Sequence, residues 1–265
     1  MGDANYPEQA PTYDETRSAN REVVRLVGGF LGEGSGRSVI DVAGGTGNYA
    51  QAIAGLGLRV AIVDREPAML ARSVPKIGAG RQILGNAERL PFAEGTVDAV
   101  MCISAMHQFD DHRAAMREAR RVMRDGPYVL QVFTQENLIP AFAFEYFPGS
   151  GPPPGMHEPA GVTETWLREA GFSRVERAIF VYSDTSDATL HALHVDPAAL
   201  ADAELMRNTS FFQRLPAEAR AVGLAALRRD LESGTLAERV REGMRLAAEQ
   251  GHGTVFAAWP GSSRG

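Results

Sequence analysis

The chain has 265 residues, of which 44% are hydrophobic and 23% charged, which is the composition of a globular protein with a sizeable core. Its formal net charge of −6, without a dense Lys/Arg cluster, argues against a nucleic-acid partner. The single cysteine, Cys102, excludes an internal disulfide framework and a cysteine-rich zinc site, and no uncharged run approaches the roughly 20 apolar residues of a membrane helix. Because its first residues also lack the layout of a signal peptide, we expect a cytoplasmic protein without a membrane partner.

The N-terminal part of the chain changes character at about residue 20. Residues 1–16 are polar and contain proline, so we expect them to be mobile until another part of the protein holds them. Apolar residues at helical spacing predict a helix over 20–31, and the glycine-rich run 32–36 ends it. This pattern divides the chain into an N-terminal segment, 1–36, and a main domain, 37–265.

Short apolar runs alternate with helical patterns in the next hundred residues. Near-continuous apolar strands separated by helices are typical of a parallel sheet that is covered on both faces. The strands are expected at 38–43, 58–64, 81–84, 97–104 and 128–134, and the helices between them at 48–55, 67–74 and 113–124.

The alternation is interrupted after residue 134. The aromatic, proline-rich stretch 135–160 cannot be a regular helix throughout, and residues 196–250 have the pattern of two or three helices. Between and after them the α/β pattern resumes, with a helix at 164–170 and strands at 174–182 and 254–259. The sequence therefore predicts one α/β domain with two insertions, at about 135–160 and 183–250.

The most informative segment is a strand that runs through a glycine turn into a helix, residues 39–50. Glycines allow a sharp turn and let a ligand approach the main chain closely. In an open α/β sheet, the first such turn is where nucleotide-like ligands bind. Asp64 ends the next strand, where its carboxylate can accept hydrogen bonds from both ribose hydroxyls of an adenosine.

Two classes of cofactor fit this turn. Gly45, Gly47 and Ala50 match the loose dinucleotide pattern G-x-G-x-x-G/A, so an NAD(P)-dependent oxidoreductase is an alternative. Asp41, at the end of the first strand, would repel a pyrophosphate but attract the cationic methionine part of S-adenosylmethionine. Asp41 therefore favours S-adenosylmethionine.

Three ordered motifs extend this interpretation: Asp41–Gly47 (DVAGGTG), Asp64–Leu70 (DREPAML) and Gly85–Phe92 (GNAERLPF). With these motifs, residues 38–134 and, more weakly, 162–182 resemble the class I S-adenosylmethionine-dependent methyltransferases, in the small-molecule branch similar to ubiquinone and menaquinone biosynthesis enzymes. Ala43 stands where that family has a glycine, and Asn86 where it has an aspartate. We expect the Ala43 methyl group to narrow the space around the methionine part, and Asn86 to accept through its amide oxygen.

The resemblance implies a Rossmann-like α/β fold: a mostly parallel sheet with an antiparallel last strand, helices on both faces, and a cap formed by the two insertions. It also implies that Asp41 and Gly45 hold the methionine part and Asp64 the ribose, while Asn86 and Ala87 contact the adenine. The resemblance further implies that the N-terminal segment 1–36 closes over the cofactor and that its Tyr13 covers the cofactor. The full set of expected cofactor-binding residues is Tyr13, Asp41, Ala43, Gly45, Gly47, Asp64, Arg65, Met69, Asn86, Ala87, Glu88 and Ser104.

Residues for the methyl acceptor are harder to identify. His107 follows the fourth core strand and titrates in the useful range, so it is the candidate general base, although it could equally be a loop histidine that orients the backbone. Phe144, Tyr146 and His157 lie in the first insertion and are candidates for acceptor binding. His191 and His194 are three residues apart, but without a third ligand we expect two solvated histidines and no metal.

The sequence thus predicts a small-molecule methyltransferase of secondary metabolism that transfers a methyl group in line from S-adenosylmethionine and releases S-adenosylhomocysteine. An NAD(P)-dependent oxidoreductase and a non-catalytic cofactor-binding relative remain as alternatives. The identity of the acceptor, the atom methylated and the oligomeric state are left open.

Overall fold

The structure is a computed structural model that describes residues 6–138, 141–149, 151–152 and 156–261. The chain divides into two compact units. Unit 1 consists of Met1–Glu22, Phe133–Glu158 and Ile179–Gly253, and unit 2 of Val23–Val132, Pro159–Ala178 and Thr254–Gly265. The expected N-terminal segment, 1–36, is therefore shared between the two units, and its residues 1–5 lie outside the described part of the chain.

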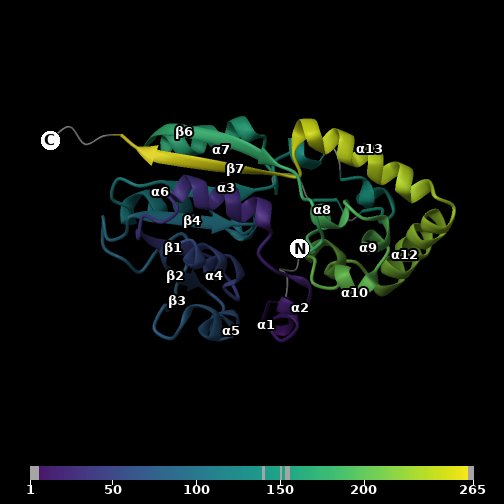
Figure 1. Cartoon of the computed structure of the whole chain (residues 1–265), viewed down its shortest axis with the longest axis horizontal. Coiled ribbons are helices and arrows are strands. Elements are labelled where there is room, and N and C mark those ends of the chain that lie inside the picture. Colours follow the sequence, from purple (N-terminus) through teal and green to yellow (C-terminus); the bar gives the residue numbers. More distant parts are fainter. Residues whose placement is uncertain (1–5, 139–140, 150, 153–155, 262–265) are drawn as a thin grey trace. The chain divides into compact units, whose positions relative to one another are not determined.

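Unit 2 contains almost all of a seven-stranded sheet in the order β3-β2-β1-β4-β5-β7-β6 (Figure 1). Its first five strands pair in parallel, and β7 is antiparallel to β5, as the family resemblance implies. The strands are β1 Ser38–Val42, β2 Arg59–Asp64, β3 Gln82–Leu84, β4 Ala99–Ile103, β5 Tyr128–Val132, β6 Phe172–Phe180 and β7 Gly253–Pro260.

Helices connect these strands and cover the sheet. One helix precedes the sheet, two follow β1 and β2, a short 3-10 helix follows β4, and two more helices lead into β5 and β6. They are α3 Arg21–Leu31, α4 Asn48–Gly55, α5 Pro67–Ile77, η1 Met106–Gln108, α6 His112–Val122 and α7 Ala160–Glu169.

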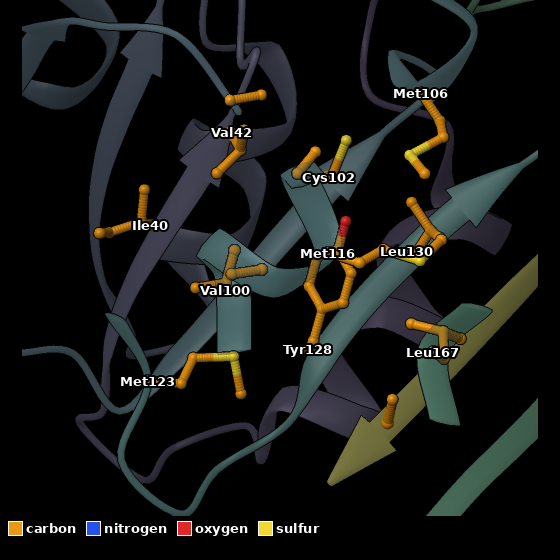
Figure 2. Packing of buried hydrophobic residues seen from close by; sticks show 14 of the residues in the cluster. Ile40, Val42, Val100, Cys102, Met106, Met116, Met123, Tyr128, Leu130 and Leu167 are labelled. Carbon is orange, nitrogen blue, oxygen red and sulfur yellow. The ribbon is translucent and has the colours of Figure 1, made fainter. Parts of the chain in front are cut away.

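One face of the sheet packs against α6 and α7. Figure 2 shows Met116 of α6 and Leu167 of α7 beside Val42, Val100 and Leu130 of the central strands, all of them buried. Because neighbouring residues of a strand point to opposite faces, the burial of Val42 on this side places its neighbour Asp41 on the other side. The apolar pattern of β1 therefore directs a carboxylate away from this apolar cluster.

Unit 1 is mainly helical and has a core of its own. Its described helices are α1 Tyr6–Gln9, α2 Tyr13–Thr16, η2 Glu136–Leu138, η3 Phe142–Glu145, α8 Leu190–Leu193, α9 Pro197–Leu200, α10 Ala203–Met206, α11 Ser210–Gln213, α12 Ala217–Glu232 and α13 Thr235–Gln250. Among the residues the structure describes, no helix is both long and apolar enough to span a membrane.

The second insertion has more helices than the sequence predicts. Residues 196–250 form five described helices, whereas the periodicity predicts two or three. The reason is local capping: the side chains of Asp196 and Asp202 accept hydrogen bonds from the backbone N–H groups of Ala198 and Glu204. Each such cap begins a new short helix.

The N-terminal residues of unit 1 are held by the second insertion. The guanidinium of Arg17 donates to the buried carboxylate of Asp187 over 2.6 Å, and the Thr16 carbonyl accepts from Ala188 N–H over 3.0 Å. The amide of Asn208 donates to the Thr12 carbonyl over 3.0 Å. These contacts keep residues 12–17 ordered, although their composition alone is that of a mobile terminus.

Gly223, in the middle of α12, provides a test of how tightly unit 1 is packed. A Cβ atom at this position would come within 2.1 Å of the buried Phe147 ring and 2.8 Å of the Tyr146 carbonyl. We expect Gly223→Ala to destabilise the protein by about 1–3 kcal/mol through overpacking, despite the better helix propensity of alanine. Gly29→Ala in α3 is the matched control, because no atom lies within 4 Å of a Cβ there.

The control should stabilise the protein by about 0.5–1 kcal/mol, since it gains helix propensity without a clash. Thermal unfolding of both variants, followed by circular dichroism, measures the difference. A Gly223→Ala protein that melts at or above the wild-type temperature would contradict the close packing of α12 on Phe147.

Candidate functional site

The loop after β1 has an unusual backbone. Ala43, Gly45 and Gly47 adopt positive φ angles of 57°, 55° and 81°, of which the first is uncommon for a residue with a side chain. A Cβ atom on Gly47 would approach the side chains of Ile62 and Ser73 to 2.9 Å. The loop therefore needs glycine at this position both for its conformation and for its close approach to β2 and α5.

Asp64, the last residue of β2, fastens this loop. Its Oδ2 accepts a hydrogen bond from Gly45 N–H over 2.8 Å, and its Oδ1 accepts one from Glu66 N–H over 2.9 Å. Burial raises the pKa of the Asp64 carboxyl, while the two backbone hydrogen bonds act in the opposite direction. Each carboxylate oxygen has a second lone pair, so Asp64 can still accept from a pair of ribose hydroxyls.

Asp41 lies directly beneath the same loop. Its side chain is 1% exposed, its Oδ2 has no hydrogen-bond partner, and a Cβ atom on Gly44 would come within 2.6 Å of that oxygen. Burial and the nearby Asp64 charge raise the pKa of the Asp41 carboxyl well above its usual value. A buried carboxylate oxygen without a hydrogen-bond partner favours a cationic ligand.

Asp41 thus fits the cationic methionine part of S-adenosylmethionine, and it does not fit a pyrophosphate. This observation on the structure agrees with the choice between the two cofactors that the sequence favours.

The residues expected near the adenine lie in a turn after β3. Asn86 is exposed, and its amide oxygen accepts from Glu88 N–H over 2.8 Å. The Glu88 carboxylate in turn accepts from the backbone N–H groups of Asp110 and Asp111, over 2.7 and 2.9 Å. Ala87 is buried. Glu88 therefore ties the turn to the segment after η1, and the Asn86 oxygen keeps one lone pair for a ligand.

The remaining expected cofactor residues occupy different surroundings. Met69 is buried in the first turn of α5, whereas Arg65 at the end of β2 is exposed. Ser104 follows β4 with a φ angle of 54°, and its hydroxyl donates to the side-chain oxygen of Gln131 over 2.5 Å.

Gln131 was not anticipated from the sequence: it is fully buried on β5, and its amide nitrogen has no hydrogen-bond partner. The signal for it was a polar residue inside an otherwise apolar strand.

His107, the candidate base, lies in η1 and is half-buried. Its neighbour Met106 is buried in the apolar cluster of the sheet (Figure 2). The strand β4 and the packing of Met106 therefore fix the position of the His107 backbone, which belongs to the same unit as Asp41 and Asp64.

The expected acceptor residues Phe144, Tyr146 and His157, together with Tyr13, all belong to unit 1. Phe144 packs edge-on against Phe211 with ring centroids 5.8 Å apart. Tyr146 is buried, and its hydroxyl donates to Asp230 over 2.7 Å. The structure therefore places Phe144 and Tyr146 in the core of unit 1.

Tyr13 and His157 are half-buried. The Tyr13 ring lies beneath the guanidinium of Arg17, with 5.3 Å between the ring centroid and the guanidinium carbon. His157 packs edge-on against Phe133 at 6.3 Å.

The expectation that His191 and His194 are solvated is wrong. They are 5% and 1% exposed, because α8 is buried on all sides within unit 1. The expected absence of a metal stays a prediction. Within the described ranges, no three His, Cys, Asp or Glu side chains are arranged to hold a metal ion.

Comparison with known proteins identifies the central part of the chain. Residues 40–130 match the family described as "Methyltransferase domain". A demethylmenaquinone methyltransferase of Renibacterium salmoninarum is 33% identical over 46% of this chain and 54% of its own length. The O-methyltransferase resE of Aspergillus sclerotiorum is 32% identical over 44% of this chain and 47% of its own length. The chain thus spans about half the length of these curated relatives.

A solved structure agrees over almost the whole chain. The crystal structure of a putative methyltransferase from an antibiotic biosynthesis pathway of Anabaena variabilis superposes with a TM-score of 0.79 and 27% identity. The match covers 92% of this chain and 98% of the other. The predicted fold class and the resemblance to methyltransferases are confirmed.

The positive φ of Ala43 leads to a prediction about stability. A left-handed conformation costs a residue with a Cβ roughly 1–2 kcal/mol relative to glycine. We therefore expect Ala43→Gly to raise the free energy of unfolding by about 1 kcal/mol. In contrast, Ala54→Gly in the neighbouring helix α4 should lower it by about 0.5–1 kcal/mol. Urea unfolding of the two variants measures both changes, and an Ala43→Gly protein less stable than wild type would disagree with the strained loop.

The buried histidines of unit 1 predict a loss of stability in acid. Burial lowers the pKa of His157, His194 and His252 to about 4, and that of His191 well below its usual value. In the unfolded chain these groups titrate near pH 6.5, so below that pH the unfolded state binds protons that the folded state does not. Folded unit 1 should therefore lose stability as the pH falls from about 6.5 to 4, by at most about 1.4 kcal/mol per pH unit for each histidine.

In unit 2, the raised pKa values of Asp41 and Asp64 have the opposite effect, because these carboxyls bind protons more readily when folded. Hydrogen exchange measured by mass spectrometry at several pH values separates the units. After correction for intrinsic rates, peptides covering 187–200 should lose protection before peptides covering 38–64. Equal loss in both regions would contradict this order.

Proposed function

We propose that this chain, a member of the class I S-adenosylmethionine-dependent methyltransferases, transfers a methyl group from S-adenosylmethionine to a small-molecule acceptor. The observation that carries the proposal is the buried, unpartnered carboxylate oxygen of Asp41 beneath the loop that Asp64 fastens. This arrangement suits a ligand that combines a cationic group with an adenosine.

In this proposal the residues of unit 2 divide the cofactor between them. Asp41 attracts the cationic methionine part, and the Gly45–Gly47 turn lets it approach the backbone. Asp64 accepts from the ribose hydroxyls. Ala87 and Met69 provide apolar contacts to the adenine, and Asn86 accepts a hydrogen bond from it. When bound, S-adenosylmethionine supplies a methyl group on a positively charged sulfur, which a nucleophile displaces in line.

The protein's main contribution to such a reaction is alignment of the acceptor with the methyl group. His107 is the candidate to take a proton from an acceptor oxygen or carbon, because a neutral imidazole is a suitable base near pH 7. The names of the relatives, a demethylmenaquinone methyltransferase and an O-methyltransferase among them, support an acceptor of the hydroxylated aromatic or quinone type. The Anabaena neighbour supports a place in secondary metabolism.

Calorimetric titration with S-adenosylmethionine, S-adenosylhomocysteine and NADH tests the cofactor assignment. We expect micromolar binding of the first two and no binding of NADH. Methyl transfer is then tested with trideuteromethyl-labelled S-adenosylmethionine and a panel of phenols, hydroxyquinones and keto acids, with mass spectrometry of the products. If the cofactor binds but no acceptor in a broad panel gains the label, the protein is a binding relative and transfer is refuted.

The role of Asp64 can be measured by substitution. Asp64→Ala removes a charged hydrogen-bond acceptor from the ribose and also releases Gly45 N–H. It should therefore weaken S-adenosylhomocysteine binding by about 1.5–3 kcal/mol, or roughly 10- to 150-fold. Asp125→Ala removes an exposed carboxylate just before β5, at the opposite end of the sheet, and should leave the affinity unchanged. Wild-type affinity in Asp64→Ala would place the cofactor elsewhere.

A further inference from the structure

Lys76 joins α5 to the end of the loop after β1. Of the 27 lysine and arginine residues of the chain, it is the only lysine, and it lies in the last turn of α5. Its ammonium group donates to Thr46 Oγ1 over 3.2 Å and to Asn48 Oδ1 over 2.5 Å. Thr46 belongs to the glycine turn and is buried, and Asn48 is the first residue of α4. The single lysine thus contacts the segment that the proposed cofactor approaches.

The loop after β1 needs such contacts to keep its conformation. It contains three glycines, Gly44, Gly45 and Gly47, and ordering a glycine costs more conformational entropy than ordering any other residue. Ala43, at the start of the loop, has a positive φ angle, which a residue with a Cβ atom keeps only where the surrounding structure imposes it. The conformation of the loop is therefore set by what holds it.

Helix α5 holds the loop from both of its ends. At its start, the Asp64 carboxylate accepts from Gly45 N–H and from the N–H of Glu66, which is the N-cap residue of α5. At its end, Lys76 donates to Thr46. Two consecutive residues of the loop are thus connected to opposite ends of one helix.

Between these two contacts, α5 packs directly on the loop. A Cβ atom on Gly47 would approach the Ser73 side chain to 2.9 Å. Ser73 is buried and lies three residues before Lys76, so the two side chains project from neighbouring positions of the helix surface. The face of α5 that packs on the loop therefore continues into the ammonium group of Lys76.

The charge of Lys76 suits α5 but not α4. A cation is favourable in the last turn of a helix, where Lys76 lies, and unfavourable at the first residue of a helix, which is Asn48. Holding the long side chain in one conformation also costs entropy. The hydrogen bonds to Thr46 and Asn48 outweigh both costs, so their loss should affect the loop.

We propose that Lys76 is a positioning residue of the cofactor site. Through Thr46 and Asn48 it keeps the loop after β1 in the conformation that binds S-adenosylmethionine, and it does not contact the cofactor itself. The amine and the cofactor are then linked: a bound cofactor strengthens the hold of the loop on Lys76, and loss of that hold weakens the cofactor by the same factor. This inference rests on the proposed function in one respect: it identifies the loop as the binding site of S-adenosylmethionine.

The single lysine allows this link to be measured without a substitution. Sulfosuccinimidyl acetate at pH 8 acetylates accessible amines, and Lys76 carries the only side-chain amine of the chain. Acetylation replaces the charged ammonium group by a neutral amide, and peptide mass spectrometry measures its rate. Saturating S-adenosylhomocysteine should slow it, and the acetylated protein should bind S-adenosylhomocysteine more weakly in calorimetry, both by about 3- to 30-fold, the usual range for residues that act through others.

Two substitutions remove the contact from either side. Lys76→Met removes the ammonium group, and Thr46→Val removes the acceptor hydroxyl while keeping the branched shape. Lys76→Met should weaken S-adenosylhomocysteine binding by about 3- to 30-fold. The double variant should bind within about twofold of Lys76→Met, because both changes break the same contact. Arg81→Met is the matched control: it removes an exposed positive charge just after α5 and should leave the affinity unchanged.

The Thr46→Val variant also separates the two ways in which a cofactor can slow acetylation. If the cofactor acts through the loop, S-adenosylhomocysteine should protect Lys76 less in Thr46→Val than in the wild type. Undiminished protection would mean that the cofactor covers Lys76 directly, and it would overturn the positioning role.

Hydrogen exchange of the free protein tests the hold on the loop without any cofactor. Peptides covering 43–50 should exchange faster in Lys76→Met than in the wild type or in Arg81→Met. Unchanged exchange, wild-type affinity after acetylation, or additive losses in the double variant each overturn the proposal.

The same measurements separate this failure from that of the proposed function. If the wild type binds S-adenosylhomocysteine and Lys76→Met binds it equally well, the role of Lys76 is refuted and the cofactor assignment stands. If the loop exchanges faster in Lys76→Met but the wild type does not bind S-adenosylhomocysteine, the cofactor assignment is refuted, and with it the link between Lys76 and the cofactor.

Discussion

The site in unit 2 depends on one interaction, the pair of hydrogen bonds by which the Asp64 carboxylate holds Gly45 and Glu66. These bonds join the loop after β1 to the turn after β2, two segments separated by helix α4. With the loop fixed in this way, Gly44 is held against the Asp41 carboxylate, Gly45 stays partly accessible, and Gly47 is buried against β2 and α5. Loss of the Asp64 carboxylate would release the loop, and in the proposed binding mode it would also remove the acceptor for the ribose hydroxyls.

The same arrangement buries two negative groups on adjacent parallel strands. Burial raises the pKa of both Asp41 and Asp64, and the charge of Asp64 raises that of Asp41 further. A cation bound beside Asp41 would supply the interaction that Asp41 Oδ2 lacks, and it would weaken the repulsion between Asp41 and Asp64. The two buried carboxylates therefore destabilise this part of the fold, and a positively charged ligand would remove that destabilisation. Binding sites frequently have this property.

Most of unit 2 could be predicted from the sequence because its signals are local. The strand, glycine turn and helix of residues 39–50 are contiguous, and Asp64 ends the next apolar run. The strand boundaries differ from the expected ones by only a few residues. Gln131 was missed because its contact with Ser104 depends on the pairing of β4 with β5.

Unit 1 could not be predicted to the same extent, since it is assembled from three stretches that are far apart in the chain. The helical pattern of 196–250 was visible, but the aspartate caps that divide it were not recognised. The ion pair of Arg17 with Asp187 spans 170 residues, and no local pattern indicates it. It explains why residues expected to be mobile are part of a folded unit.

The histidines show most clearly where sequence reasoning stops. Spacing brought His191 and His194 to attention as a pair, yet the contacts separate them: His194 is saturated by Leu190 and Ala143, whereas His191 is not. A third buried histidine, His252, is 61 positions beyond His191, and its tautomer is set by the backbone N–H of Tyr182, from which Nδ1 accepts. A tautomer depends on which backbone group faces each nitrogen, so it is a property of the tertiary structure.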